Sequence, residues 1–97
     1  MREVARAHNG RSAFALAKAK RPDLVLCDLR LPGDIDGFAM VRAARADEQL
    51  QKTRFVAVSG YSQPNDYAQA GRAGFEQLVP QPITLEIIEK LINDKLS

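Results

Sequence analysis

Three polar residues follow apolar segments of the sequence, and their types and positions could carry chemistry. Asp28 comes directly after the apolar run 24–27. Ser59 follows the run 55–58, and Gln81 lies between two prolines further along the chain. A carboxylate, a hydroxyl and an amide gathered in one place could hold a small anion or a metal ion. The elements that precede these residues decide whether they meet.

Those elements alternate in type along the chain. Short apolar runs bounded by turn signals predict buried strands, and apolar residues at helical spacing predict amphipathic helices. The repeated alternation of strand and helix predicts an α/β fold, with a parallel sheet covered by helices on both faces. The expected strands are residues 3–7, 24–28, 55–58 and 75–79, and the expected helices are residues 11–20, 37–50, 64–72 and a last segment after residue 84.

Several residues are expected to mark the ends of these helices. Pro22 should end the first helix, because proline has no backbone N–H and its ring clashes with the preceding turn. Asp36 and Thr84 are the expected N-caps of the second and last helices. Gly74 is the expected cap at the carboxyl end of the third helix.

In an open parallel sheet, ligands bind beyond the carboxyl ends of the strands. Asp28, Ser59 and Gln81 each follow an expected strand and precede a loop rich in glycine or proline. We therefore expect the three side chains to converge on one rim of the sheet.

The composition is that of one ordinary globular domain. The chain has 97 residues, 45% of them apolar and 27% charged, which is too short for two domains and too apolar for global disorder. Cys27 is the single cysteine, so no intramolecular disulfide forms and a reducing cytoplasm is the expected compartment. No apolar run reaches membrane-spanning length, and the first residues lack the hydrophobic region of a signal peptide.

Positive charge is concentrated in the first part of the chain. A basic face could attract nucleic acid, but no aromatic residues interleave with these charges as a stacking platform requires. Solvated faces of one strand and one helix are the favoured interpretation, and a nucleic-acid-binding domain is the weaker alternative. Up to residue 21 the basic residues are Arg2, Arg6, Arg11, Lys18, Lys20 and Arg21, against the single acid Glu3.

His8 is the only histidine, and it precedes the turn signal Asn9-Gly10. No second ligand is spaced to join it in a metal site. We expect a solvated turn histidine rather than a phosphorelay or metal-binding residue.

Three motifs, in this order, resemble the receiver domain of two-component response regulators. They are "DLVLCDLRLPGDIDGF" at 23–38, "VAVSGY" at 56–61 and "AGFEQLVPQPI" at 73–83. The resemblance implies a flavodoxin-like fold and a single, partial receiver domain over residues 1–97. It also implies a cytoplasmic phosphorelay domain that accepts phosphate without being an enzyme. Its implied partner is a histidine kinase or a phosphotransfer protein.

The resemblance assigns roles to individual residues. Asp28 corresponds to the strand-end aspartate that accepts the phosphoryl group, a usable nucleophile once a cation neutralises the incoming oxygens. Ser59 corresponds to the residue that hydrogen-bonds this group and moves on activation. The backbone amide of Gly60 corresponds to the donor beside it. The implied cofactor is Mg²⁺, held by Asp28 and by the main-chain carbonyl of Arg30.

The sequence departs from the family pattern after its last expected strand. Gln81 stands where the family has a lysine before proline, so the phosphoryl group loses a charge-assisted contact. Leu78 replaces the aromatic residue that switches position on activation, and Pro80 stiffens the loop. We therefore expect impaired signal transmission.

A second departure lies at the start of the chain. The family's first strand and helix, and the acidic pair that ends this strand, find no counterpart, so a truncated domain of about four strands and four helices is expected. Mg²⁺ binding should be poor, because this ion prefers several oxygen ligands. Asp34 and Asp36 could lean in from the following loop, but Asp36 has a better role as a helix cap.

In the flavodoxin-like strand order 2-1-3-4-5, the missing strand is central. Its loss leaves the segments 3–7 and 24–28 paired directly, or exposes the hydrophobic edge of the second segment. Such an edge invites another chain, so we expect self-association.

Two functions from different classes follow. The first is a receiver domain of a two-component phosphorelay, impaired in phosphotransfer, that accepts phosphate at Asp28. The second is a phosphorylation-independent module that binds a partner protein or itself. The absent acidic pair and Gln81 both favour the loss of phosphotransfer.

Overall fold

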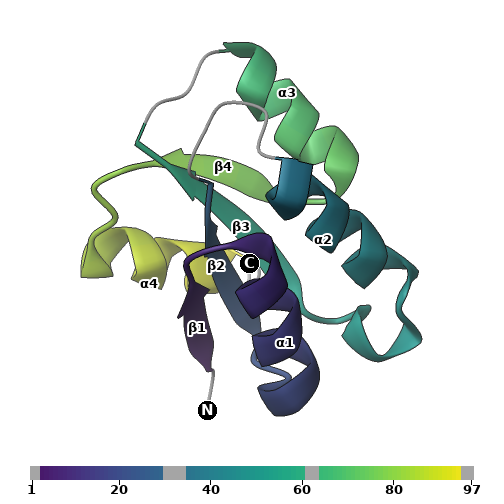
Figure 1. The fold of residues 1–97 in the computed structure, drawn as a ribbon. Helices are drawn as coiled ribbons and strands as arrows, with labels where there is room; N and C mark the ends of the chain where they lie inside the picture. The colour runs from purple at the N-terminus through teal and green to yellow at the C-terminus, as the bar shows by residue number, and fades with distance from the viewer. Residues whose placement is uncertain (1–2, 30–34, 61–63, 95–97) are drawn as a thin grey trace.

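The computed structural model describes residues 3–29, 35–60 and 64–94. Strands and helices alternate along the chain, as the sequence predicts (Figure 1). The elements are β1 (Val4–Ala7), α1 (Gly10–Lys20), β2 (Leu24–Asp28), α2 (Ile35–Ala46), the 3-10 helix η1 (Glu48–Leu50), β3 (Arg54–Ser59), α3 (Pro64–Ala73), β4 (Gln77–Pro80) and α4 (Leu85–Asp94).

The four strands form one parallel sheet in the order β1-β2-β3-β4. Strand β1 pairs directly with β2, with Val4 opposite Leu24 and Ala7 opposite Cys27. Of the two arrangements expected for these segments, the structure has direct pairing. Among the described residues, β2 therefore lies between two strands and has no open edge.

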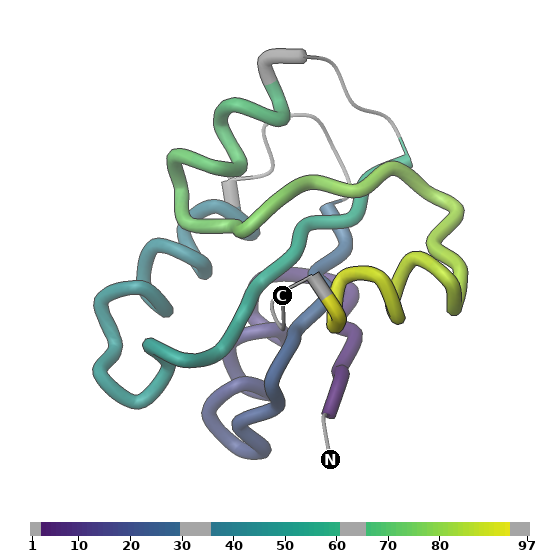
Figure 2. Tube along the Cα trace, turned by 180° about the vertical axis from the view of Figure 1, so that it is seen from behind, coloured from purple at the N-terminus to yellow at the C-terminus, as the bar shows by residue number. Residues whose placement is uncertain are grey.

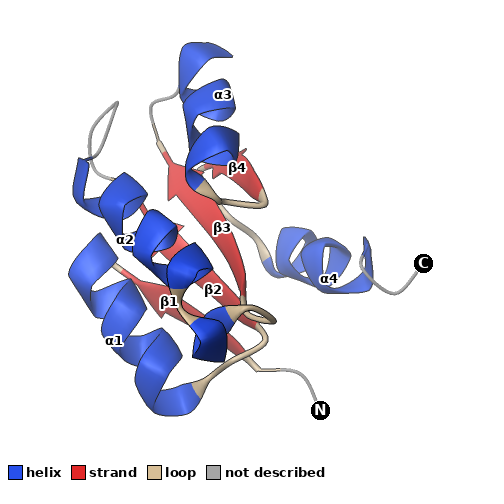
Figure 3. Ribbon diagram, turned by 90° about the vertical axis from the view of Figure 1, so that its right-hand side faces the viewer, coloured by secondary structure: helices blue, strands red, loops and turns tan. Residues whose placement is uncertain are grey.

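Helices cover both faces of the sheet, which confirms the predicted flavodoxin-like α/β architecture. Helices α1, α2 and α3 lie on one side and α4 lies alone on the other (Figure 3). The view from behind shows α4 nearest the viewer (Figure 2). Because side chains alternate along a strand, the two faces receive different residues. The three-helix side buries Val25, Cys27, Phe55, Ala57 and Leu78, and the α4 side buries Leu24, Leu26, Val56, Val58 and Val79.

An ion pair holds α4 at one end of the sheet, and this end is opposite to the one where Asp28 lies. Arg54, at the start of β3, donates from Nε to Glu76 Oε1 at 2.9 Å and from Nη2 to Glu76 Oε2 at 2.5 Å. Its Nη2 also donates to the backbone oxygen of Leu91, in α4, at 2.6 Å. A guanidinium near the carboxyl end of a helix also complements the helix dipole.

Two of the expected helix caps are confirmed. The hydroxyl of Thr84 accepts a hydrogen bond from the backbone N–H of Ile87 at 3.2 Å, as an N-cap does. Gly74 follows α3 with φ of 130°, and its N–H donates to the oxygen of Ala70 at 3.2 Å. A positive φ is the conformation for which glycine is suited.

Other boundaries differ from the expectation. Helix α2 begins at Ile35, so Asp36 lies in its first turn, where its charge suits the helix dipole, and not at the cap. Helix α1 begins one residue earlier than expected, at Gly10, whereas its expected end at residue 20 is confirmed, with a left-handed Arg21 directly before Pro22. Strand β4 begins at residue 77 and not at 75, because the backbone N–H of Phe75 donates to the oxygen of Ala70 at the end of α3, at 3.0 Å.

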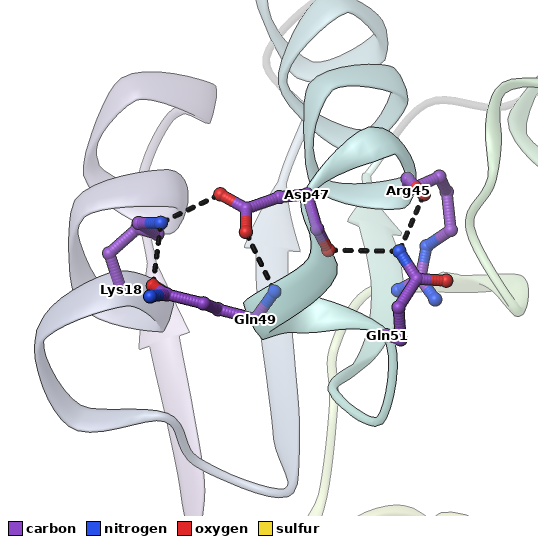
Figure 4. A network of polar contacts seen from close by, with 5 residues as sticks. All are labelled: Lys18, Arg45, Asp47, Gln49 and Gln51. Atoms are coloured by element: carbon purple, nitrogen blue, oxygen red, sulfur yellow. Dashed lines mark hydrogen bonds and ion pairs between the residues drawn. The ribbon is translucent and has the colours of Figure 1, made fainter.

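A polar network joins α1 to η1, an element that the sequence analysis did not predict (Figure 4). The Nζ of Lys18 donates to Asp47 Oδ2 at 2.7 Å and to Gln49 Oε1 at 2.8 Å. The other carboxylate oxygen of Asp47 accepts from the backbone N–H of Gln49 at 2.8 Å. The side chain of Gln51 donates to the backbone oxygens of Arg45 and Asp47. The network fixes the turn between α2 and β3.

Within the described residues, no helix is both long and apolar enough to span a membrane.

Replacing Gly10 with alanine should destabilise the fold. A Cβ at Gly10 would overlap the backbone oxygen of Asp36 and lie 2.7 Å from its carbonyl carbon, so α1 and α2 would have to move apart. Overpacking of this kind costs about 1–3 kcal/mol. The matched control is Gly71→Ala, because a Cβ at Gly71 meets nothing within 4 Å and lies in α3. That change should stabilise by about 0.4–1 kcal/mol. Urea unfolding that finds both variants equally stable would contradict the close approach.

Replacing Asp47 with asparagine should remove a pH-dependent part of the stability. The hydrogen bond from Lys18, followed by that from the N–H of Gln49, lowers the pKa of Asp47 from its ordinary value of 3.8. The carboxylate therefore stabilises the fold fully above pH 3.8, and this stabilisation is lost as the pH falls through the lower pKa of the folded state. Urea midpoints of the wild type and Asp47→Asn should differ at neutral pH and converge in acid. A gap between the two midpoints that stays constant at every pH would refute the linkage.

Candidate functional site

The candidate site lies at the carboxyl ends of the strands. Asp28 is the last residue of β2 and Ser59 is the last residue of β3. Asp28 pairs with Val58, so Ser59 is the next residue along the neighbouring strand. Gln81 directly follows β4. The structure thus places these three residues at one rim of the sheet, where a parallel sheet presents its ligand-binding loops.

Both oxygens of the Asp28 carboxylate contact side chains from the β1 segment. Arg6 Nε donates to Asp28 Oδ1 at 3.1 Å, and Arg6 Nη2 lies 3.1 Å from the same oxygen. His8 Nδ1 lies 3.3 Å from Oδ2. The carboxylate of Asp28 is 17% exposed, whereas the side chains of Arg6 and His8 are 41% and 76% exposed. Asp28 is therefore a largely buried acid, and it is contacted by a guanidinium and an imidazole that remain open to solvent.

The direct pairing of β1 with β2 brings these residues together. Arg6 pairs with Leu26, so it points to the same face of the sheet as Asp28, two residues further along β2. A long side chain reaches such a diagonal neighbour. His8 follows β1 at the next position with the same alternation. The contacts of Asp28 thus depend on which strand lies beside β2.

A second group of contacts joins the ends of β3 and β4. The backbone N–H of Gln81 donates to the oxygen of Ser59 at 2.9 Å. The amide side chain of Gln81 lies over Gly60, since a Cβ at that glycine would be 3.1 Å from Gln81 Oε1. Ser59 itself is buried, with 6% of its surface exposed. Ser59, Gly60 and Gln81 thus lie together at the ends of β3 and β4.

Mg²⁺ ligands were expected at Asp28 and at the main-chain carbonyl of Arg30. This ion takes near-octahedral oxygen coordination, usually from one or two carboxylates, waters and phosphates. Within residues 3–29, 35–60 and 64–94, no group of three or more His, Cys, Asp or Glu side chains could hold a metal ion. The Asp28 oxygens instead face a guanidinium and an imidazole. Two residues considered as ligands, Arg30 and Asp34, lie outside the described residues.

Comparison with known proteins settles the family. Residues 1–93 match the response regulator receiver domain. The chain belongs to the receiver domain family of response regulators. The protein PilH of Pseudomonas aeruginosa is 30% identical over 95 residues, which are 98% of this chain and 78% of PilH. The expected loss of a first strand and helix finds no support in the family match, which begins at residue 1.

Solved receiver structures share the fold. The signal receiver domain of NarL from Mycobacterium tuberculosis is 32% identical, with a TM-score of 0.73 over 90% of this chain and 68% of that one. The receiver domain of the sensor histidine kinase PA1611 from Pseudomonas aeruginosa is 19% identical, with a TM-score of 0.75 over 96% of this chain and 95% of that one. A magnesium ion is coordinated in the active site cleft of the PA1611 domain. Receiver domains act as phosphoacceptors rather than enzymes, with histidine kinases as their partners.

The sequence analysis missed two residues of the site, Arg6 and His8. Arg6 was counted with the solvated basic face, but it is paired with Asp28. His8 is exposed, as expected for a turn histidine, yet it also contacts Asp28. The signal available in the sequence was the possible direct pairing of segments 3–7 and 24–28. Direct pairing of these two segments places Arg6 and Asp28 on one face of neighbouring strands.

Proposed function

We propose that this receiver domain, a single domain over residues 1–97, accepts a phosphoryl group at Asp28 from a histidine kinase or a phosphotransfer protein, and that its phosphotransfer is impaired. The observation that carries the proposal is the position of Asp28 at the carboxyl end of β2, with both its oxygens already held by Arg6 and His8. At this position, Asp28 can act as the phosphoacceptor. The contacts with Arg6 and His8 oppose phosphorylation, because a carboxylate whose oxygens are already hydrogen-bonded is a weaker nucleophile.

The neighbouring residues support the roles that the family resemblance implies. Ser59 ends the strand beside Asp28, where its hydroxyl can hydrogen-bond a phosphoryl group, and Gly60 follows with its backbone amide. Gln81 lies over Gly60 and can donate a hydrogen bond but carries no charge. Loss of a charge-assisted contact weakens binding of the doubly charged phosphoryl group. We propose weak Mg²⁺ binding at Asp28 and the carbonyl of Arg30 as a further cause of impairment.

The cytoplasm is the proposed location of the domain. Cys27, its single cysteine, is buried in β2 and forms no disulfide, which suits a reducing compartment.

Incubation with acetyl phosphate and Mg²⁺ should add one phosphoryl group to the chain. We expect an acid-stable, base-labile mass gain that Asp28→Asn abolishes, because the acyl phosphate forms on that carboxylate. Gln81→Lys should raise the rate of the gain by roughly tenfold, the effect of one charge-assisted hydrogen bond. Intact-mass spectrometry over time measures both effects.

Asp23→Asn is the matched control, since this acid lies at the opposite end of β2 and its loss should leave the mass gain unchanged. A wild-type chain that gains no mass would overturn the phosphoacceptor assignment. A Gln81→Lys variant that reacts at the wild-type rate would show that the missing charge is not a cause of impairment.

The second candidate function is a phosphorylation-independent interaction module that binds a partner protein or itself. The ion pair of Asp28 with Arg6 in the unmodified chain favours this function, because it fills the acceptor site from within. The open edge expected on residues 24–28 is covered by β1. In the described sheet β1 is itself an edge strand, and the other edge strand, β4, ends in Pro80, which cannot donate to a ladder. We therefore propose that self-association uses the outer edge of β1.

Light scattering over a concentration series tests this self-association. The mean mass should rise from that of the 10.7 kDa monomer towards that of a dimer as protein concentration increases. The expected cause is strand addition at β1, which buries unpaired backbone groups. A constant monomer mass at high concentration would remove self-association from the proposal.

A further inference from the structure

The outer edge of β1 carries backbone groups that no other described strand pairs. Among the described residues, β1 is hydrogen-bonded to β2 alone, at the edge of the sheet (Figure 1). The backbone oxygen of Glu3 accepts from the N–H of Leu24 at 3.2 Å, so Glu3 turns its backbone groups towards β2. Backbone groups of successive strand residues point to opposite sides, so Ala5 also faces β2. Val4 and Arg6 therefore turn their N–H and C=O groups outwards.

We propose that a second copy of this chain adds its own β1 to this edge, antiparallel, with Ala5 opposite Ala5 of the second copy. The inference rests on the proposed self-association, and it assigns the register and the symmetry of that contact. A two-fold axis perpendicular to the sheet then relates the copies, as in an isologous dimer. The two sheets become one continuous sheet that is joined at the two β1 strands.

This register pairs the outward groups of both strands. With Ala5 opposite its counterpart, Val4 lies opposite Arg6 of the second copy. Residues that face each other across an antiparallel ladder alternate between a pair that exchanges two N–H···O=C bonds and a pair that exchanges none. Val4 and Arg6 form the hydrogen-bonded pairs, and Ala5 with its counterpart forms the other kind. The two-fold axis repeats the Val4–Arg6 pair, so each outward N–H and C=O of these residues gains a partner.

The neighbouring symmetric registers are less favourable. A register centred on Arg6 sets two guanidinium side chains directly opposite each other, and like charges in that position destabilise a strand pair. A register centred on Val4 sets Arg6 opposite position 2, which lies outside the described strand. Only the register centred on Ala5 pairs the outward groups within Val4–Ala7 without opposing like charges.

The side chains on the α4 face of β1 suit this arrangement. Val4 is a half-buried apolar residue that packs against the core on that face. The aliphatic stem of Arg6 from the second copy would cover it, as the stems of long basic side chains do on apolar surfaces. The charge of Arg6 is offset within its own chain by Asp28, whose Oδ1 lies 3.1 Å from Nη2. The dimer therefore brings two ion pairs together, and not two uncompensated cations.

On the other face, α1 offers a second apolar residue near the same edge. Leu16 is half-buried. Each helix residue is turned by about 100° from the one before it, so Leu16 lies on the flank of α1 opposite to Phe14 and Lys18. Lys18 reaches Asp47, beside the end of α2 (Figure 4). The flank that carries Leu16 is therefore turned away from α2, towards the outer side of β1, where the two-fold axis would bring two copies of α1 together.

The antiparallel arrangement leaves both candidate phosphoacceptor sites open. All strands of one copy run in the same direction, and the strands of the second copy run in the opposite one. The two rims that carry Asp28 therefore lie at opposite ends of the joined sheet. Self-association and phosphate acceptance at Asp28 do not exclude each other in this dimer.

A disulfide across the two-fold axis tests the register. In a pair without ladder hydrogen bonds the two Cα atoms are about 4.5 Å apart, which lies within the range that a disulfide spans. Ala5→Cys treated with oxidised glutathione should therefore form a covalent dimer within the self-associated protein, measured by intact-mass spectrometry without reductant. The matched control is Ala15→Cys, whose thiol is exposed on α1 and should cross-link far more slowly. The wild type serves as a second control, because its Cys27 is buried.

A second pair of variants tests the outward backbone groups. Val4→Pro removes an N–H that points away from β2, a position that tolerates proline on an edge strand. Each dimer loses two hydrogen bonds, so the dissociation constant from light scattering should rise roughly tenfold or more relative to Val4→Ala, which loses apolar contact but keeps the N–H. Circular dichroism checks that both variants are folded, and the Ala5→Cys test does not depend on them.

The contrary results have separate meanings. A wild-type chain that remains monomeric at high concentration overturns the proposed self-association together with this inference, and it leaves the role of Asp28 untouched. A wild-type chain that self-associates is decided by the variants. Cross-linking of Ala5→Cys no faster than that of Ala15→Cys, or equal dissociation constants for the two Val4 variants, overturns the β1 register and assigns self-association to another surface.

Discussion

The direct parallel pairing of β1 with β2 is the constraint on which the candidate site depends. Its register sets Ala7 opposite Cys27, so the side chains of Arg6 and Asp28 share one face of the sheet. The guanidinium then reaches a carboxylate that is 17% exposed. The two side chains form an ion pair at the end of β2. Among the described residues, the strand neighbour of β2 therefore supplies the positive charge at this acid.

The rim also joins the two layers of the fold. Asp28 continues the strand positions of Leu24 and Leu26, which pack on the α4 side. Ser59 continues the positions of Phe55 and Ala57, which pack under α1, α2 and α3. A group bound between Asp28 and Ser59 would therefore contact residues that belong to both layers. Helix α4 is held at the far end of the sheet by Arg54, away from this rim.

Much of the fold could be predicted from the sequence because its signals are local. Apolar runs located the strands, and Thr84 and Gly74 marked helix ends through contacts within one turn. The rim position of the site followed from the rule for parallel sheets. The contact of Arg6 with Asp28 could not be read in this way, because it joins residues 22 positions apart and depends on strand order. The contact of Phe75 with Phe38 in α2 likewise joins residues far apart in the sequence.

Gln81 stands where the family pattern has a lysine, and Arg6 contacts Asp28 from β1. The positive charge near this carboxylate therefore lies in another place than in the family pattern. In the sheet order, Gln81 follows β4 on one side of β2, whereas Arg6 belongs to β1 on the other. The permanent positive charge that contacts Asp28 among the described residues therefore comes from the β1 side of the sheet, through a strand neighbour of β2 and not through β4.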